Sequence, residues 1–405
     1  MSQHPLSTPA RRGFSLIELM IGMLIGLLCT LVIATVLGAA EGNRRGTTSG
    51  TDAQIAGNLA LFGVRREVES SGYGFASETD AVGCQLVAVF NGVPVAALPQ
   101  RLAPVLITQG AGGLSDRVRV ISSAKGIDPI IGSTDGFTVP VRVQSDTGSA
   151  TEPGYKPGAT YVGVANNLTY QQGDLVVAVT PAATGLPENN CELFEVNAPV
   201  NSTVNAFQVP RLDEPARWNP VGHPAITSVG PSAGRPGTFL VNLGRISDRE
   251  FSVDANQRLM VSTLDTATLT RTATEVQGGV VLLKAMYGRD TDGDGAVDRY
   301  DYNTPNSVAT WQNVLSVRMA VVARSGHYEK DEVTTENPTW DVGKAAAVDG
   351  AADCDGSQCI TLRVDLVSAD WQHYRYRVFD TVVPLRNQRF RSGNVAAPPP
   401  PASGA

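Results

Sequence analysis

Five carboxylates lie close together in one short segment, in a pattern that could hold a divalent cation. Counted from Asp290, aspartates occupy positions 1, 3, 5, 9 and 12, which are Asp290, Asp292, Asp294, Asp298 and Asp301. Gly295 at position 6 permits a sharp turn, and Ala296 can offer its backbone carbonyl at position 7. Oxygen ligands at this spacing are typical of a calcium loop, because they can wrap around one ion and relieve the repulsion among the carboxylates.

This acidic loop departs from the usual calcium loop in two ways. Asp301 stands where the longer Glu is usual, and the run from Val280 to Tyr287 before the loop predicts a strand rather than a helix. The other interpretation is a solvent-exposed hairpin of Asp and Gly turns without a metal. We expect a bound Ca²⁺ with a structural role, which ties a loop between two strands.

The cysteines suggest an oxidising compartment. Cys29 lies in an apolar N-terminal run, and the four cysteines beyond it are Cys84, Cys191, Cys354 and Cys359. An even set beyond a membrane segment is typical of two disulfides in a compartment such as the periplasm. The sequence CDGSQC can close a small loop from Cys354 to Cys359, which would leave Cys84 to pair with Cys191; free thiols are the alternative. No histidine stands at ligand spacing beside these cysteines, so zinc is not expected.

The N-terminal segment combines two arginines, one isolated carboxylate and an apolar run. Residues 11–18 read RRGFSLIE, and no charge interrupts the run from Leu19 to Ala40. About twenty apolar residues in a helix span roughly 30 Å, the thickness of the hydrocarbon layer of a membrane. The arginines predict a cytoplasmic N-terminus and an exported remainder. Glu18 is costly near the start of a membrane helix, so we expect it to have a partner of opposite charge.

Three ordinary signals also begin with basic residues, and each fits this segment poorly. A secretory signal peptide or a twin-arginine signal does not readily accommodate Glu18 in its apolar region. A lipoprotein signal requires a small residue before its cysteine, whereas Leu28 precedes Cys29.

The stretch GFSLIELM, from Gly13 to Met20, resembles the class III signal of type IV prepilins and pseudopilins. The resemblance implies that a prepilin peptidase cuts after Gly13 and methylates the new N-terminal Phe14. It places Glu18 at the fifth mature position. There, among staggered apolar helices, the Glu18 carboxylate can neutralise the α-amino group of the neighbouring subunit, so that neither charge is left alone in a dry core.

Two further stretches resemble PilW-type minor pilins. GYGF at 72–75, followed by Gly83-Cys84, is similar to the segment after the long helix in that family. The phrase from Tyr376 to Asn387 is similar to the family's C-terminal end. The resemblance is strong over about the first 80 and last 30 residues, weaker around the acidic loop and thin across the middle.

The resemblance implies a minor pilin that helps to prime assembly of a type IV pilus and lies near its tip. The implied partners are the prepilin peptidase, other minor pilins, the major pilin, an inner-membrane assembly platform and, in some cases, a tip adhesin. The implied location is the inner membrane, in one pass with a periplasmic head, and later the pilus at the cell surface. A J-type pseudopilin of type II secretion has a similar leader and fold and is the alternative.

The expected fold is α+β and pilin-like, with one long helix on a mostly antiparallel β head. After a leader at 1–13, the helix should comprise a transmembrane part at 14–40 and a part at 41–71 that packs on the head and ends at Ser71-Gly72. In the second part, apolar residues recur at helical spacing and predict a stripe buried against a sheet. They are Ile55, Leu59 and Phe62, widened by Leu61, Val64 and Val68.

The head, about 72–390, contains short β-prone runs separated by Gly, Pro, Asn and Asp, which is typical of antiparallel sheets. The predicted strands lie at 117–121, 175–179, 239–243, 280–287, 314–323, 360–367 and 374–383. We expect an inserted lobe at about 91–271 and a disordered Pro-rich tail at 391–405.

The composition and motifs argue against two other classes of function. The 405-residue chain has a net charge of −7, which gives no electrostatic reason to bind nucleic acid. It contains no HExxH, GxSxG, Walker-type or GxGxxG pattern, so we do not expect an enzyme. A tethered or secreted hydrolase or binding domain with an ordinary signal remains a third hypothesis. A mature N-terminus near Ala39 or Ala40 would favour it, whereas a methylated Phe14 would favour a pilin.

Overall fold

The computed structural model divides the chain into two compact units, Met1–Asp52 and Ala53–Ala405. The predicted leader at 1–13, Phe14, the predicted tail at 391–405 and parts of the predicted inserted lobe lie outside the described residues. The described residues are 15–125, 140–144, 159–183, 188–200, 205–213, 217–219, 226 and 237–389.

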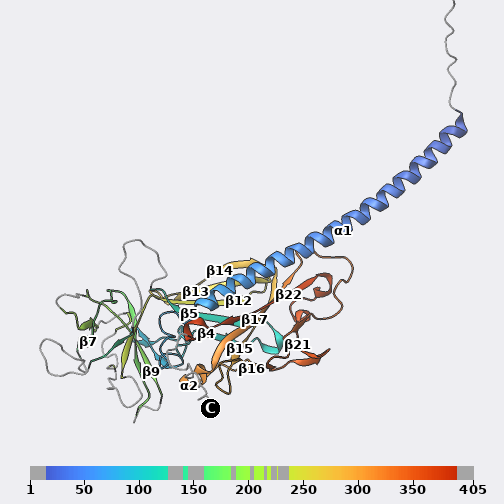
Figure 1. The fold of residues 1–405 in the computed structure, drawn as a ribbon. Helices are drawn as coiled ribbons and strands as arrows, with labels where there is room; N and C mark the ends of the chain where they lie inside the picture. The colour runs from blue at the N-terminus through green and yellow to red at the C-terminus, as the bar shows by residue number, and fades with distance from the viewer. Residues whose placement is uncertain are drawn as a thin grey trace, which may run out of the picture. The chain divides into compact units, whose positions relative to one another are not determined.

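One long helix, α1, spans Leu16–Ser70 (Figure 1). Its first 22 residues, Leu16–Leu37, are long and apolar enough to cross a membrane, and none of them is buried. The helix ends where expected: Gly72 adopts φ +73°, a left-handed conformation that Gly reaches without strain, and its N–H bonds the carbonyl of Ile121 at 2.8 Å. The sequence therefore predicts both the existence of this helix and its end.

Within the second unit, α1 buries its small residues and exposes its large ones. Its buried side chains in this unit are Ala53, Ala56, Ala60, Val64 and Val68. Ile55 and Leu59 are each 53% exposed and Phe62 is 64% exposed, so the predicted buried stripe was wrong for these three residues, whereas its members Val64 and Val68 are fully buried.

Close approach of the sheets explains this choice of face. A Cβ atom at Gly57 would lie only 2.0 Å from the ring of Phe379, and one at Gly63 would lie 3.4 Å from Val276. At Gly57 the helix therefore meets the ring of Phe379 with no side chain of its own, and a larger residue there would have to displace that ring.

A first sheet, sheet 1, has the strand order β14-β13-β12-β5-β4, and all its neighbours are antiparallel. It contains the predicted strand at 117–121. An ion pair connects it to α1, because the guanidinium of Arg249 in this sheet lies 2.6 Å from the carboxylate of Glu67. The strands are β4 (Val105–Thr108), β5 (Arg117–Ser123), β12 (Ile246–Val253), β13 (Arg258–Asp265) and β14 (Thr270–Gly278).

Sheet 2 follows directly, because Gly279 at φ +77° separates β14 from β15 and lets the chain change sheets. Its order is β19-β16-β15-β17-β22, with β16 and β19 parallel and the other pairs antiparallel. The strands are β15 (Val280–Arg289), β16 (Arg299–Asp301), β17 (Val314–Arg324), β19 (Ala347–Val348) and β22 (Tyr376–Pro384).

Sheet 3 has the order β1-β9-β8-β11-β6, in which β1 and β9 are parallel. It contains the predicted strands at 175–179 and 239–243. The strands are β1 (Gln85–Val87), β6 (Val141–Arg142), β8 (Leu175–Thr180), β9 (Asn190–Glu195) and β11 (Phe239–Gly244).

Small elements complete the described chain. The short strands are β2 (Val89–Phe90), β3 (Val93–Pro94), β7 (Tyr161–Gly163), β10 (Gln208–Pro210), β18 (Thr339–Asp341), β20 (Ala352–Cys354) and β21 (Ser357–Thr361). The short helices are η1 (Ala111–Gly113), α2 (Val308–Gln312), η2 (Val364–Leu366), η3 (Trp371–His373) and α3 (Arg386–Arg389). The predicted strand at 360–367 is therefore wrong beyond Thr361, because a single 3-10 turn replaces it.

Among the described residues, the hydrophobic core has one main cluster and two smaller ones. The main cluster joins α1 residues such as Val64 to sheets 1 and 2 and to one face of sheet 3. A second cluster lies within 141–240, on the other face of sheet 3, and a third is formed by sheet 2 with β18 and β21. The second cluster, within 141–240, thus covers a shorter stretch than the inserted lobe expected at about 91–271. The reason is that residues of β4, β5 and β12–β14 belong to the main cluster.

Candidate functional site

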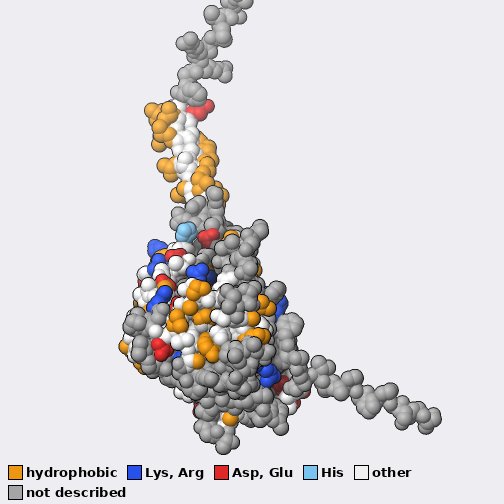
Figure 2. Space-filling view, turned by 90° about the vertical axis from the view of Figure 1, so that its left-hand side faces the viewer, with side chains coloured by type: hydrophobic (Ala, Val, Ile, Leu, Met, Phe, Trp, Pro, Cys, Tyr) orange, Lys and Arg blue, Asp and Glu red, His pale blue; other side chains and the backbone are white. Residues whose placement is uncertain are grey.

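The apolar segment Leu16–Leu37 is the most conspicuous surface of the first unit. Its Leu, Ile, Val and Met side chains are more than half exposed on all sides of the helix, and Figure 2 shows hydrophobic side chains covering it. A helix that is hydrophobic all round needs lipid or other apolar helices around it. Its length and composition therefore suit a membrane span or a bundle of similar helices.

Glu18 is the one carboxylate in this segment, and it lies in the first turn of α1. Its Oε2 atom accepts a long bond, 3.4 Å, from the backbone N–H of Ser15, and no basic side chain among the described residues pairs with it. The helix N-terminus favours a negative charge, but in an apolar setting a partner of opposite charge is still required. Within the part of the chain that the structure describes, this carboxylate therefore has no partner of opposite charge.

A second exposed apolar surface lies on the part of α1 in the second unit. Ile55, Leu59 and Phe62, here named the helix stripe, follow the spacing i, i+4, i+7 and share one face of the helix. All three are more than half exposed, whereas Val64 on the opposite face is fully buried. The helix stripe is available for contact with another apolar element.

The acidic loop connects β15 to β16 and brings three of the predicted ligands together. One carboxylate oxygen from each of Asp290, Asp292 and Asp294 lies within 4.8 Å of the others. Short Asx turns shape the loop: Asp290 accepts bonds from the N–H groups of Gly293 and Gly295, at 2.6 and 2.9 Å. Asp294 accepts a bond of 2.7 Å from the N–H of Ala296.

Asp298 is held on the side of the loop by a neighbouring threonine. Its Oδ2 atom accepts bonds from the backbone N–H and the hydroxyl of Thr291, at 2.6 and 2.9 Å. These hydrogen bonds, that from the backbone first, hold the pKa of the Asp298 carboxyl below its ordinary value, so it is ionised at neutral pH.

Asp301 does not belong to this cluster, contrary to the sequence-based ligand set. Strand pairing places Asp301 opposite Tyr287, where it is buried. Its two carboxylate oxygens lie 2.5 and 3.0 Å from the guanidinium of Arg289. A buried carboxylate needs such a partner, and the register of the sheet supplies it.

The structure contains both expected disulfides, whereas Cys29 is free and exposed. Cys354 and Cys359 close the predicted small loop, in which Asp355 and Gly356 form the turn at φ +48° and +80°.

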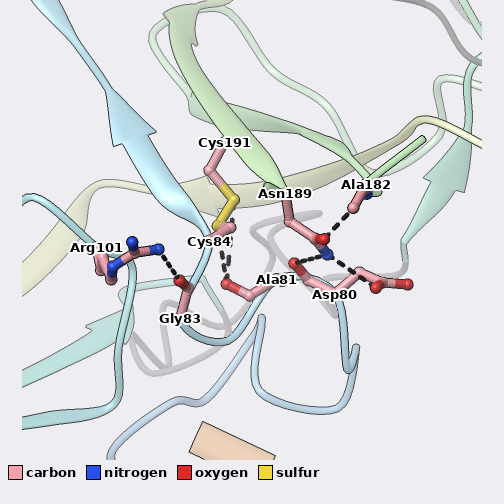
Figure 3. The surroundings of a disulfide bond; sticks show 8 residues. All are labelled: Asp80, Ala81, Gly83, Cys84, Arg101, Ala182, Asn189 and Cys191. Atoms are coloured by element: carbon pink, nitrogen blue, oxygen red, sulfur yellow. Dashed lines mark hydrogen bonds between the residues drawn. A yellow bond between two sulfur atoms is a disulfide. The ribbon is translucent and has the colours of Figure 1, made fainter. Parts of the chain in front are cut away.

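The second disulfide joins Cys84, just before β1, to Cys191 in β9, and both residues are fully buried (Figure 3). Around it, Asn189 donates to Asp80 Oδ1 at 2.8 Å and Arg101 donates to the carbonyl of Gly83 at 2.9 Å. This disulfide fixes the segment after α1 to sheet 3.

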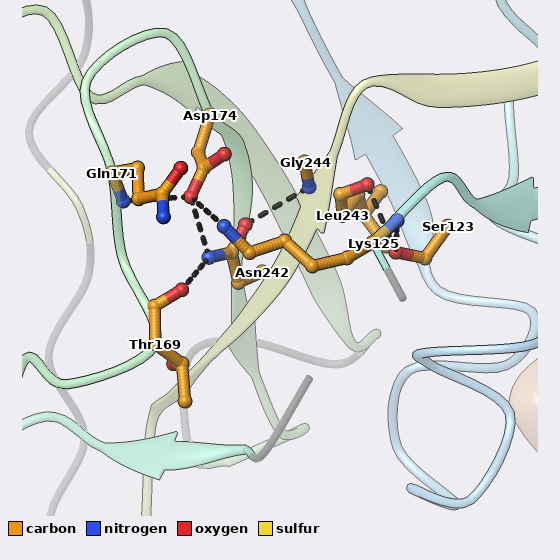
Figure 4. A network of polar contacts seen from close by, with 8 residues as sticks. All are labelled: Ser123, Lys125, Thr169, Gln171, Asp174, Asn242, Leu243 and Gly244. Atoms are coloured by element: carbon orange, nitrogen blue, oxygen red, sulfur yellow. Dashed lines mark hydrogen bonds and ion pairs between the residues drawn. The ribbon is translucent and has the colours of Figure 1, made fainter. Parts of the chain in front are cut away.

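A buried polar network, which the sequence did not predict, connects the end of β5 to sheet 3 (Figure 4). Lys125 Nζ lies 2.6 Å from Asp174 Oδ2, which also accepts bonds of 2.8 Å from Gln171 N–H and Asn242 Nδ2. The available signal was Asn242, a polar residue inside the otherwise apolar strand FLVNLG. These contacts join buried residues of one chain, so we assign the network a structural role.

Comparisons with known families match two parts of the chain. Residues 249–387 match the family model "Type IV Pilus-assembly protein W". The match covers the acidic loop, sheet 2, β13, β14 and the part of β12 from Arg249 onward. Residues 8–40 match the model "Prokaryotic N-terminal methylation motif", which covers Gly13, Phe14 and Glu18. No curated protein and no solved structure matches the chain.

Proposed function

We propose that this chain is a type IV pilin of the PilW type and that it helps to prime assembly of a type IV pilus, near the pilus tip. The observation that carries the proposal is the apolar helix Leu16–Leu37, whose large side chains are more than half exposed. Its first turn holds a carboxylate, Glu18, that pairs with no basic side chain of the described residues. Such a helix is stable only among lipids or similar helices. The function is therefore packing between subunits rather than catalysis.

We propose the following order of events. A prepilin peptidase cuts after Gly13 and methylates Phe14 while the helix spans the inner membrane and the head lies in the periplasm. The carboxylate of Glu18 then pairs with the α-amino group of a neighbouring pilin, which removes two unpaired charges from an apolar bundle. The helix stripe, Ile55 to Phe62, adds apolar contact beyond the membrane, and the head contacts other minor pilins, the major pilin or a tip adhesin.

The experiment is Glu18→Ala, tested for membrane insertion, leader cleavage and recovery in sheared pili. Insertion and cleavage should continue, because the apolar run and Gly13 are unchanged, whereas recovery in pili should fall strongly. Asp52→Ala is the matched control, since Asp52 is an exposed carboxylate on the same helix beyond the apolar run. Normal recovery of the Glu18 variant would remove the pairing argument.

We also propose a structural Ca²⁺ at the acidic loop, held by Asp290, Asp292 and Asp294. The carbonyl of Ala296 and the carboxylate of Asp298 are the further ligands that the spacing predicts, and Asp301 is not one of them. The proposal is supported by the convergence of three carboxylate oxygens within 4.8 Å, an arrangement that repels itself unless a cation is bound.

A calorimetric titration of the purified chain with Ca²⁺ tests this site. We expect binding heat from the wild type and none from the variant that combines Asp292→Ala with Asp294→Ala. Asp353→Ala with Asp355→Ala is the control, because these two aspartates are exposed and close in sequence but lie elsewhere. Absence of heat in the wild type would end the proposal.

A further inference from the structure

The outer strand of sheet 1, β14, has an unused edge. Its nine residues, Thr270–Gly278, pair with β13 on one side, and no strand of the described residues pairs with the other side. The strand contains no proline, and among the described residues no other strand pairs with its outer backbone groups. An edge of this length and kind is a template for strand addition.

Exposure distinguishes β14 from the other long edge strand, β22. Four consecutive residues of β14, from Thr272 to Glu275, are exposed, so neither face of the strand is covered there. No two consecutive residues of β22 are exposed, and its Phe379 packs on Gly57 while its Asp380 accepts a bond from Trp340 at 3.2 Å. Among the described strands of this length, β14 is the open one.

The sequence of β14 is complementary to itself in one antiparallel register. Arg271, Ala273 and Glu275 lie on one face, because alternate residues of a strand do. In a two-fold pairing centred on Ala273, Arg271 of one copy lies opposite Glu275 of the other, and this happens twice by symmetry. Thr272 and Thr274 also lie opposite each other twice. Opposite charges and threonine pairs both favour cross-strand pairing.

The internal contacts of these residues are compatible with that register. Arg271 lies 2.8 Å from Asp248 and Glu275 lies 3.2 Å from Arg258. Across the joined sheets, each basic side chain of this row would therefore lie next to an acidic one, from Asp248 and Arg271 of one copy to Glu275 and Arg258 of the other. A register centred on Thr274 instead places Arg271 opposite Gln277 and Ala273 opposite Glu275, with no charge pair.

We propose that β14 pairs antiparallel with β14 of a second copy of this chain, in the register centred on Ala273. One pair of strands buries less surface than a stable soluble dimer needs, so the contact depends on a high effective concentration. Anchoring of both chains in one membrane supplies it. The inference does not depend on pilus assembly and is tested in cells that lack the assembly machinery.

The test is cysteine cross-linking of the full chain in membranes under a mild oxidant. Cys29 is first changed to Ser, because it is the free exposed cysteine of the described chain. Ala273→Cys should then give a disulfide-linked dimer on a non-reducing gel. Asp353→Cys, an exposed residue on the edge strand β20, is the control for random collisions. Thr274→Cys tests the other register.

A charge change then tests the complementarity. In the Ala273→Cys background, Glu275→Lys places like charges opposite each other twice and should lower cross-linking about tenfold. Asp353→Lys makes the same charge change on another edge strand and should leave it unchanged. Equal cross-linking at positions 273 and 353, stronger cross-linking at 274, or no effect of Glu275→Lys would each overturn the proposal.

Discussion

We expect residues of the helix stripe to be needed for assembly but not for folding of the head, and Phe62→Ser tests this expectation. Phe62 is 64% exposed, so folding of this chain buries only a minor part of its side chain. If a neighbouring helix covers the remainder, burial of about 130 Å² at about 25 cal/mol per Å² contributes about 3 kcal/mol, or roughly 100-fold in association. Folding alone gains little from this residue, and we expect the free energy of unfolding to fall by less than about 1 kcal/mol.

Val64→Ser is the matched change on the opposite face of the same helix. Val64 is fully buried in the main cluster, so this variant places a hydroxyl in an apolar site and should lose about 2–4 kcal/mol of stability.

The assay combines urea unfolding of the purified chains with immunoblots of sheared pili. Phe62→Ser should unfold like the wild type and be depleted from pili, whereas Val64→Ser should unfold at lower urea. If Phe62→Ser unfolds as early as Val64→Ser, the helix stripe belongs to the fold of one chain. If it enters pili normally, no helix covers it.

The remaining predictions concern stability. Replacing both cysteines of Cys84–Cys191 by Ala should lower the free energy of unfolding by about 5 kcal/mol, because this disulfide closes a loop with a sequence separation of 107. The same change at Cys354–Cys359, with a separation of 5, should lower it by about 2 kcal/mol. Equal losses in urea unfolding would contradict the loop-entropy reasoning. Burial raises the pKa of Tyr287 to about 12, so between pH 10 and 12 the unfolded chain releases a proton that the folded chain keeps. Stability should therefore fall as pH rises through this window, and Tyr287→Phe should remove part of that slope; an unchanged slope would refute the assignment.

The features that the sequence predicted well are local. The apolar run, the glycine stop at Gly72 and the Asp-Gly turn between Cys354 and Cys359 each depend on a few neighbouring residues. Periodicity also identified Ile55, Leu59 and Phe62 as residues of one helix face. It could not decide which face the sheets cover, because that depends on the close approach of Phe379 to Gly57.

The features that the sequence did not predict depend on contacts between distant segments. Spacing placed Asp301 among the metal ligands, but the register between β15 and β16 pairs it with Arg289 instead. The ion pair of Lys125 with Asp174 joins segments that are 49 residues apart, and neither residue has a local motif. Such contacts follow from strand order, which local patterns do not contain.

The most direct measurement of the central claim is the number of surface pili on cells without this gene, with exoprotein secretion assayed in the same cultures. We predict that pili are lost while secretion is normal, and that the wild-type gene, but not the Glu18→Ala variant, restores them. Normal pili with blocked secretion would contradict a role in the pilus and would assign the chain to a type II secretion system.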